Sequence, residues 1–301
     1  MLLETGISNA PSQNVAKVRN RGFEFALTHR NTIGEVSYMV SANIATNNNE
    51  ITDLSSSNDI INNLENGHGV AKYILREGES IGSFYGFESD GLYTQEEIDA
   101  GHYYTPNAGD TKFVPQRELD WGEEITDSDR TIIGCEVPDF TYGINLSVNY
   151  KNFEFSIFGQ GICGADVAFE VYQVHPFFHG QDNPRRYHMG RWSEENPNPH
   201  AIYPRIYTAS SPHTTYNRAF NDYHVFDADY FRFKTMTIGY NIPRNIVSRL
   251  GMSSLKVYLT GENLFTIRAD HKMKDFDPEA TSSTVRALGS KSLALGVNVS
   301  F

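Results

Sequence analysis

The sequence has no run of about 18 or more apolar residues, so it offers no candidate for a transmembrane helix. It has only two cysteines, Cys135 and Cys163, without metal-ligand spacing, which excludes a disulfide scaffold and a structural zinc site. Basic residues are also few, 25 against 37 acidic ones, and the net charge of −12 excludes a typical nucleic-acid partner. The amino terminus lacks a basic segment followed by an apolar one, so no signal peptide is expected.

What the sequence does have is clearest in its last eleven residues, KSLALGVNVSF. Apolar side chains alternate with small or polar ones without a break, and the apolar set is Leu293, Leu295, Val297, Val299 and Phe301. This period of two predicts a strand with an apolar face towards lipid and a polar face towards a watery lumen. A terminal aromatic residue is typical of strands that the outer-membrane barrel-assembly machinery engages, so Phe301 is the candidate assembly signal.

The same alternation recurs along the chain. Residues 140–150 place Tyr142, Ile144, Leu146 and Val148 on one face, and these are predicted to face lipid with Leu293 to Val299. Further strands are expected within 15–30, 36–44, 153–164, 230–242 and 255–266, roughly nine or ten in all. Several alternate for about ten or more residues, beyond the usual 5–6 of a soluble sandwich. The prediction is an all-β fold, an antiparallel up-and-down membrane β-barrel.

The connections differ in length between the two ends of the predicted strands. Residues 31–34 and 151–152 read as short turns, whereas 47–68, 92–139 and 165–228 are long inserts with one helical turn near 95–100. Barrels of this kind keep short turns in the periplasm and long loops outside the cell. A turn at 151–152 also places Cys163 opposite Phe140, too far from Cys135 for a disulfide, so two free thiols are expected.

Aromatic residues of the long inserts are the candidate substrate-binding residues. We select Trp121, Tyr187, Trp192 and Tyr203, whose rings could stack on a sugar or a peptide at the barrel mouth. The alternative is that they pack the loops together, and the sequence leaves both open.

No catalytic site, metal site or cofactor is expected. The acidic residues between 120 and 129 have no EF-hand spacing and read as a solvated loop. The loop histidines, including His175 and His188, show no ligand spacing and read as surface residues. Adjacent carboxylates such as Glu194 and Glu195 do not supply the paired geometry of a glycosidase.

Six segments in order resemble the SusC/RagA family of TonB-dependent outer-membrane transporters. They read GESIGSFYGF (78–87), DRTIIG (129–134), RWSEENP (191–197) with YPR (203–205), FRFK (231–234) and GENLFT (261–266), and the terminal strand follows them. The chain departs from the family at 118–124, where ELDWGEE replaces an acidic loop that members often carry, so no calcium site is carried over.

The resemblance implies that residues 1–301 are the carboxyl-terminal portion of a barrel of about 22 strands, without its plug domain and amino-terminal strands. It further implies import of a glycan or a peptide across the outer membrane of a Gram-negative bacterium. The implied partners are a SusD-like surface lipoprotein, the TonB complex acting through the missing plug, the barrel-assembly machinery and outer-membrane lipid. Two alternatives stay open: a soluble β-rich carbohydrate-binding module, and a small self-closed outer-membrane barrel.

Overall fold

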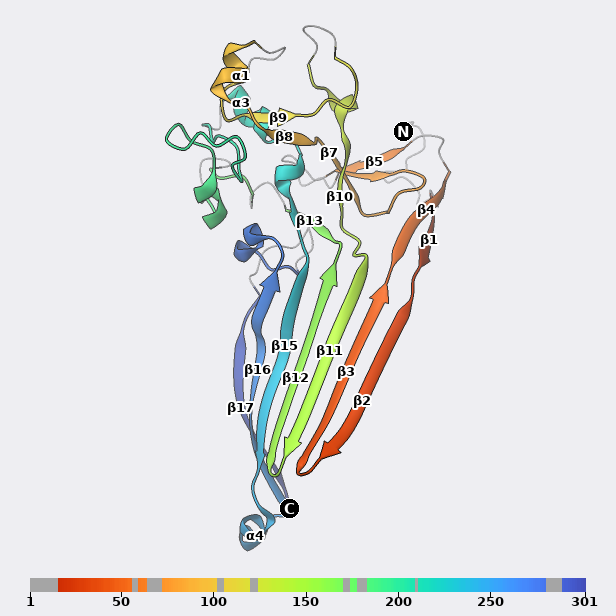
Figure 1. Ribbon diagram of the computed structural model, residues 1–301, viewed down its shortest axis with the longest axis vertical. Helices are drawn as coiled ribbons and strands as arrows, with labels where there is room; N and C mark the ends of the chain where they lie inside the picture. Colours follow the sequence, from red (N-terminus) through yellow and green to blue (C-terminus); the bar gives the residue numbers. More distant parts are fainter. Residues whose placement is uncertain are drawn as a thin grey trace, which may run out of the picture.

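A tall antiparallel sheet carries a smaller assembly of loops at one end (Figure 1). The computed structural model describes residues 16–55, 59–63, 72–101, 106–119, 124–169, 174–177, 183–208, 211–279 and 289–301. We call the sheet the wall and the loops above it the cap. Within the described ranges, no helix combines the length and hydrophobicity needed to cross a bilayer.

The wall contains seven strands in the order β17-β16-β15-β12-β11-β3-β2, all antiparallel to their neighbours. They are β2 (Glu24–Ile33), β3 (Val36–Thr46), β11 (Phe140–Tyr150), β12 (Phe153–Cys163), β15 (Tyr230–Asn241), β16 (Ser254–Arg268) and β17 (Ser292–Ser300). Their lengths of 9 to 15 residues suit tilted membrane strands. Each strand pairs with its predecessor among the seven, which confirms the predicted up-and-down order.

Three connections lie at the end of the wall away from the cap (Figure 1). Lys151 and Asn152 form the predicted tight turn, with Lys151 at a left-handed φ of 52°. The turn predicted at 31–34 falls instead at Gly34 and Glu35, because Asn31 and Thr32 still pair with Tyr38 and Ser37. The third connection holds α4 (Arg244–Val247). The carboxyl terminus lies at this end too (Figure 1).

The cap gathers short strands that belong to separate small sheets. They are β1 (Ala16–Arg21), β4 (Asn48–Leu54), β5 (Ile60–Asn63), β6 (Lys72–Leu75), β7 (Ser83–Gly86), β8 (Ser89–Leu92), β9 (Thr111–Phe113), β10 (Thr131–Cys135), β13 (Asp166–Ala168) and β14 (Val225–Asp227). The described part of the cap also holds two short helices, α1 (Gln95–Asp99) and α3 (Pro212–Asn217), and α1 is the predicted helical turn. The wall therefore has seven strands rather than roughly nine or ten, because segments such as β7 pair within the cap.

The buried apolar residues cluster in the cap. The largest cluster draws side chains from distant segments, among them Phe169, Tyr187, Phe226 and Phe276. Phe169 and Phe276 stack with ring centroids 4.1 Å apart although 107 residues separate them in the chain, 276 minus 169. The cap thus has a core like that of a soluble domain.

The cysteine prediction is confirmed. Cys163 pairs with Phe140 across β11 and β12, as the turn position required, and both Cys135 and Cys163 are free thiols.

Candidate functional site: a two-faced wall and a cavity at its mouth

Strand register brings the two predicted lipid-facing sets onto one face of the wall. Directly paired residues point to the same side of a sheet. Along one row, Val148 pairs with Phe155 and Phe155 with Ile238. The row continues from Ile238 to Leu259 and ends at Leu295 of β17. By the same pairing Tyr142, Ile144 and Leu146 share this face with Leu293, Val297 and Val299.

This apolar face is largely uncovered. Leu295 is 76% exposed and Leu293 69%, and Ile144, in the middle of the wall, is still 45% exposed. An exposed apolar surface that spans seven strands is far beyond what a soluble monomer tolerates.

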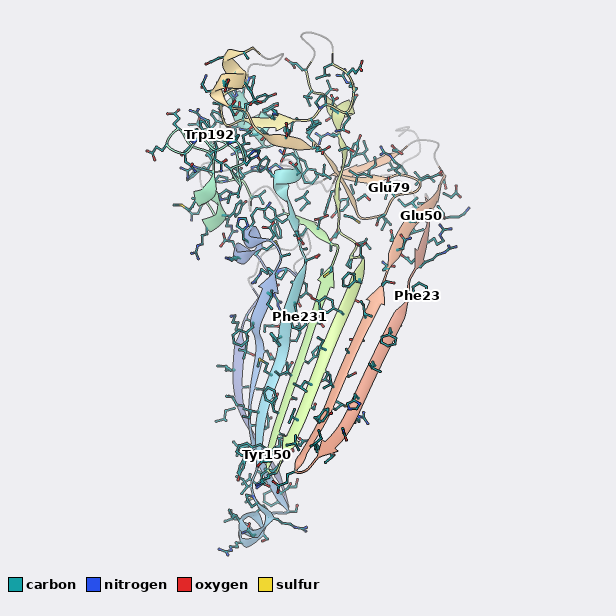
Figure 2. All side chains as sticks on the ribbon, viewed as in Figure 1. Phe23, Glu50, Glu79, Tyr150, Trp192 and Phe231 are labelled. Carbon is teal, nitrogen blue, oxygen red and sulfur yellow. The ribbon has the colours of Figure 1, made fainter. Side chains whose placement is uncertain are left out.

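Aromatic side chains mark two levels on the apolar face. Near the cap it carries Phe25, Tyr142, Phe231, Phe233 and Phe265, and near the turns Tyr38, Tyr150, Phe153 and Tyr240. Figure 2 shows Phe231 and Tyr150 at these two levels. The eight-residue step from Tyr142 to Tyr150 spans about 26 Å along a strand. A strand tilted by about 40° rises about 20 Å over this step, close to the apolar band of about 25 Å between two aromatic girdles.

Two of the cap-side aromatics lie flat on glycines. A Cβ at Gly159 would come within 2.5 Å of the Phe231 ring, and one at Gly161 within 2.6 Å of the Tyr142 ring. The two rings stack on each other with centroids 5.8 Å apart. A side chain at either position would displace the ring that lies over it, so glycine allows the two rings to lie close to the sheet.

The opposite face of the wall is polar and hydrogen-bonded between strands. One row runs through Ser147, Ser156, Thr237 and Thr260, and the two threonine hydroxyls lie 3.0 Å apart. Nearer the turns, Glu154 of β12 accepts hydrogen bonds from Asn241 and Lys256. Small hydroxyls, amides and paired charges are the lining expected of a hydrated lumen.

At the cap end, Arg232 joins the wall to the cap. Its guanidinium is buried, and it donates to Asp277 at 2.6 Å and to Glu279 at 2.7 Å. Its Nε donates to Thr266 of the neighbouring strand at 3.0 Å. Lys234 also donates to Glu279, at 2.8 Å. The segment that follows β16 is therefore held against the polar face by charge-assisted hydrogen bonds.

A cavity of about 350 Å³ opens beside this cluster, which we call the mouth cavity. Its polar lining comes from the wall and the cap together: Glu136, Gln160, Asp166, Tyr230 and Glu279. Burial raises the pKa of Asp166 above its ordinary value, and Asp227 and Asp229 add to the effect. Carboxylates, an amide and a phenol can bind sugar hydroxyls or peptide amides, so this lining suits either ligand.

Three of the four candidate aromatic residues lie inside the cap cores. Tyr187, Trp192 and Tyr203 are 5 to 6% exposed. The Tyr187 hydroxyl donates to the Val174 carbonyl at 3.2 Å, and the Tyr203 hydroxyl lies 2.8 Å from His175 Nδ1. Trp192, labelled in Figure 2, covers Gly109 and stacks beneath the Arg205 guanidinium. Their rings stabilise the cap, and a substrate would reach them only if these loops rearranged. Trp121 lies outside the described residues, and substrate binding by all four stays a prediction.

The surface prediction is wrong for His175 and His188, and a third histidine, His224, is also buried. His175, His188 and His224 are buried together, at 2 to 3% exposure, although His200 is exposed as expected. Burial lowers the pKa of each, that of His224 to about 3. His188 Nδ1 accepts from the Arg185 amide and His224 Nδ1 from the Asn221 amide, so both rings end turns as neutral acceptors. In the sequence, the one feature related to this role is a spacing: each of these two histidines lies three residues after the residue whose amide it accepts.

The acidic loop is also only partly solvated. Asp127 is exposed, but Asp129 is fully buried and accepts the Thr126 amide at 2.9 Å, capping a short 3₁₀ turn. Within the described ranges, no group of three or more potential metal ligands comes together. Phe301 is 92% exposed beside the third turn, and its role as an assembly signal stays a prediction.

Comparison with curated proteins gives related receptors. The chain is 31% identical to TonB-dependent receptor P3 of Formosa agariphila over 271 residues, 89% of this chain and 26% of the relative. It is 30% identical to TonB-dependent receptor P26 of the same bacterium over 320 residues, 99% of this chain and 30% of the relative. SusC of Bacteroides thetaiotaomicron is 23% identical over 92% of this chain and 26% of SusC. The chain spans about a quarter to a third of these relatives. No family model matches it.

Solved structures agree on the fold. The RagAB peptide importer in its closed-closed state matches 96% of this chain and 30% of the importer chain, with a TM-score of 0.72 at 21% identity. The fold class predicted from the sequence, an open part of a large membrane β-barrel, is therefore confirmed.

Proposed function

This chain belongs to the SusC/RagA family of TonB-dependent receptors, and from that premise we propose that it forms the carboxyl-terminal part of the barrel wall of a nutrient transporter in the outer membrane of a Gram-negative bacterium. The cargo is a bulky nutrient, a glycan or a peptide, that passes along the polar face. The role is transport and not catalysis, in keeping with relatives that are named receptors and a neighbour that is named an importer.

One observation carries the proposal: the register of the seven strands places most apolar side chains on one exposed face and most polar ones on the other. A barrel wall between hydrocarbon and water uses a polar face and an apolar face that no protein layer covers. The sheet also ends in unpaired edges at β2 and β17 within the described residues. Such edges cost several kcal/mol per unsatisfied group in lipid, so further strands must complete the barrel.

The partners follow from the family and the arrangement of the ends. We propose that a SusD-like surface lipoprotein covers the cap. TonB supplies energy through a plug domain held inside the barrel. The barrel-assembly machinery engages β17 and Phe301 during insertion, and lipid then meets the apolar face.

The wall is tested with cysteines placed in the whole receptor in cells. Ser147→Cys on the polar face should react with a membrane-impermeant maleimide, and neighbouring Leu146→Cys on the apolar face should not. The native thiols Cys135 and Cys163 are first replaced by serine so that only the new thiol reports. Equal labelling of both positions would mean that the two faces meet the same solvent, and the proposal would fall.

The mouth cavity is tested by uptake of labelled oligosaccharides and peptides. Gln160→Trp fills the cavity and should reduce uptake of the cargo, whereas Gln160→Asn keeps an amide there and should not. Normal uptake by a correctly assembled Gln160→Trp receptor would exclude the cavity from the transport path. The cargo that is lost identifies the substrate class.

The two alternatives fit less well. A soluble carbohydrate-binding module would not expose Leu293, Leu295 and Val297 by 55 to 76%. A small self-closed barrel needs β17 to pair with an early strand, but in the described part of the chain β17 pairs with β16 alone.

A further inference from the structure

The third turn of the wall, residues 242–253 between β15 and β16, differs from the other two. It contains α4 and a 3₁₀ turn (Ser248–Leu250). The helical part ends at Gly251, which has a left-handed φ of 72°. Figure 1 shows it projecting beyond the wall at the end away from the cap. The flanking ladder continues through a hydrogen bond from Ile242 to Leu255 at 2.8 Å, so the turn is anchored to the wall.

The turn presents apolar side chains without a covering partner. Ile246 is 49% exposed and Leu250 63%, whereas Val247 between them is fully buried against the turn itself. The turn therefore exposes two large apolar side chains, one from α4 and one from the 3₁₀ turn.

The same turn is basic. Arg244 and Arg249 are exposed, and neither has a carboxylate partner among the described residues. No acidic residue occurs between positions 242 and 261, in a chain whose net charge is −12. The turn at Lys151 offers the contrast, since Lys151 forms an ion pair with Glu35 of the neighbouring turn at 3.2 Å.

The level of the turn relative to the wall is the third observation. The turn begins two residues after Tyr240. Tyr240 belongs to the aromatic level near the turns and contacts Phe153 with ring centroids 4.7 Å apart. Aromatic girdles lie at the headgroup region of a bilayer. A short helical turn just beyond such a girdle, which exposes both apolar and basic side chains, has the composition of an interfacial anchor.

We propose that residues 242–253 form a binding site for anionic phospholipid headgroups on the periplasmic leaflet. Ile246 and Leu250 enter the interface, and Arg244 and Arg249 bind phosphate groups. The site rests on the proposed membrane placement of the wall, and it fixes the depth of the β15–β16 hairpin. Guanidinium groups suit this role because their planar donors match phosphate oxygens.

The test uses the whole receptor reconstituted in bilayers, with Leu250→Trp as a fluorescent reporter and brominated lipids as quenchers. The signal of Trp121 and Trp192 is subtracted by measuring the parent receptor under the same conditions. Brominated phosphatidylglycerol should quench the reporter at lower content than brominated phosphatidylcholine. Arg244→Gln or Arg249→Gln should each reduce this preference roughly fivefold, and the double variant should abolish it. Lys151→Gln, at the paired turn, should leave it unchanged.

A second reporter separates the two possible failures. Tyr150→Trp lies in the aromatic level beside the paired turn and should be quenched equally by both lipids. If Tyr150→Trp is quenched but Leu250→Trp is not, another molecule or water covers the turn and this inference is overturned. Equal quenching of Leu250→Trp by both lipids, unchanged by the arginine substitutions, also overturns it. If neither reporter is quenched, the membrane placement of the wall itself is wrong.

Discussion

The wall and the cap are built for different solvents. Among the described residues, the twelve largest fully buried side chains include none from the seven wall strands; eleven lie in the cap and one, Val247, in the third turn. The wall buries little within this chain, since both of its faces are largely uncovered. In the barrel that we propose, lipid covers the apolar face and water or a plug the polar face. The cap instead buries Phe84, Phe226 and Phe276 as a soluble protein does.

The wall and the cap therefore depend on different features of the sequence. The wall needs a period of two and backbone pairing, and its strands are specified almost locally. The cap needs contacts between segments far apart in the chain, such as that of Phe169 with Phe276. Substitutions should therefore act through solvent exposure in the wall and through lost partners in the cap.

The largest effect is expected where the two regions are joined. Arg232→Ala removes two charge-assisted hydrogen bonds, worth about 1.5–3 kcal/mol each, and leaves the partly buried Asp277 without its ion-pair partner, while Glu279 keeps Lys234. The segment 276–279 should therefore open more easily by about 3–5 kcal/mol. Amide hydrogen exchange of this segment measures the change. The matched control is Arg232→Met with Asp277→Asn and Glu279→Gln, which removes these three charges, leaves only the partly exposed Lys234 without its partner, and should cost less. If the single and triple variants open equally, the ion pairs do not hold the cap to the wall.

A charge on the apolar face should have the next largest effect. Leu293→Arg places a cation in the row of Leu146, halfway between the two aromatic levels, and should destabilise the whole receptor by about 2–4 kcal/mol in urea unfolding from lipid vesicles. The adjacent Ala294→Arg points to the polar face and should be close to neutral. Similar losses from both substitutions would show that β17 does not separate lipid from water.

The wall could be predicted from the sequence, whereas most of the cap could not. The alternation at 140–150 and 292–300 predicted the strands, their faces and even the pairing of Phe140 with Cys163, because a tight turn and a period of two fix register. It could not predict that Tyr187, Trp192 and Tyr203 are buried. Their rings are covered by residues such as Val174 and Gly109, and no local pattern announces such distant neighbours.

The mouth cavity also could not be predicted from the sequence. Gln160 and Tyr230 stood on predicted strands, but Glu136, Asp166 and Glu279 come from loops whose placement depends on tertiary contacts. Asp166 is in place because it pairs through β13 with β14 and accepts the Cys135 amide at 3.0 Å. Strands of three residues carry too little sequence signal to be recognised alone.

Acidification should weaken the cap and leave the wall unchanged. The pKa of His224 in the folded cap, about 3, lies below its unfolded value near 6.5, because burial and nearby Lys272 disfavour the charged ring. Stability from this neutral ring is complete above pH 6.5 and is lost as pH falls towards 3, by about 1.4 kcal/mol per pH unit. His224→Asn keeps an acceptor for the Asn221 amide and should flatten the dependence. Hydrogen exchange of 221–228 against β11, corrected for intrinsic rates, measures it, and a variant as pH-sensitive as the parent would contradict it.

The smallest expected effect concerns helix α1, a part of the cap that was predicted from the sequence. Helix α1 begins with a capping box, in which Thr94 Oγ1 accepts the Glu97 amide at 3.2 Å and Glu97 accepts the Thr94 amide at 2.9 Å. Thr94→Ala removes half of the box and should cost about 1 kcal/mol, whereas Thr94→Ser keeps the hydroxyl and should cost much less. Because α1 buries none of its residues, the loss should be confined to amide exchange within 95–101. If Thr94→Ala also loosened Trp192 or the mouth cavity, α1 would be coupled to the cap core, and the division between locally and distantly specified structure would fail at this helix.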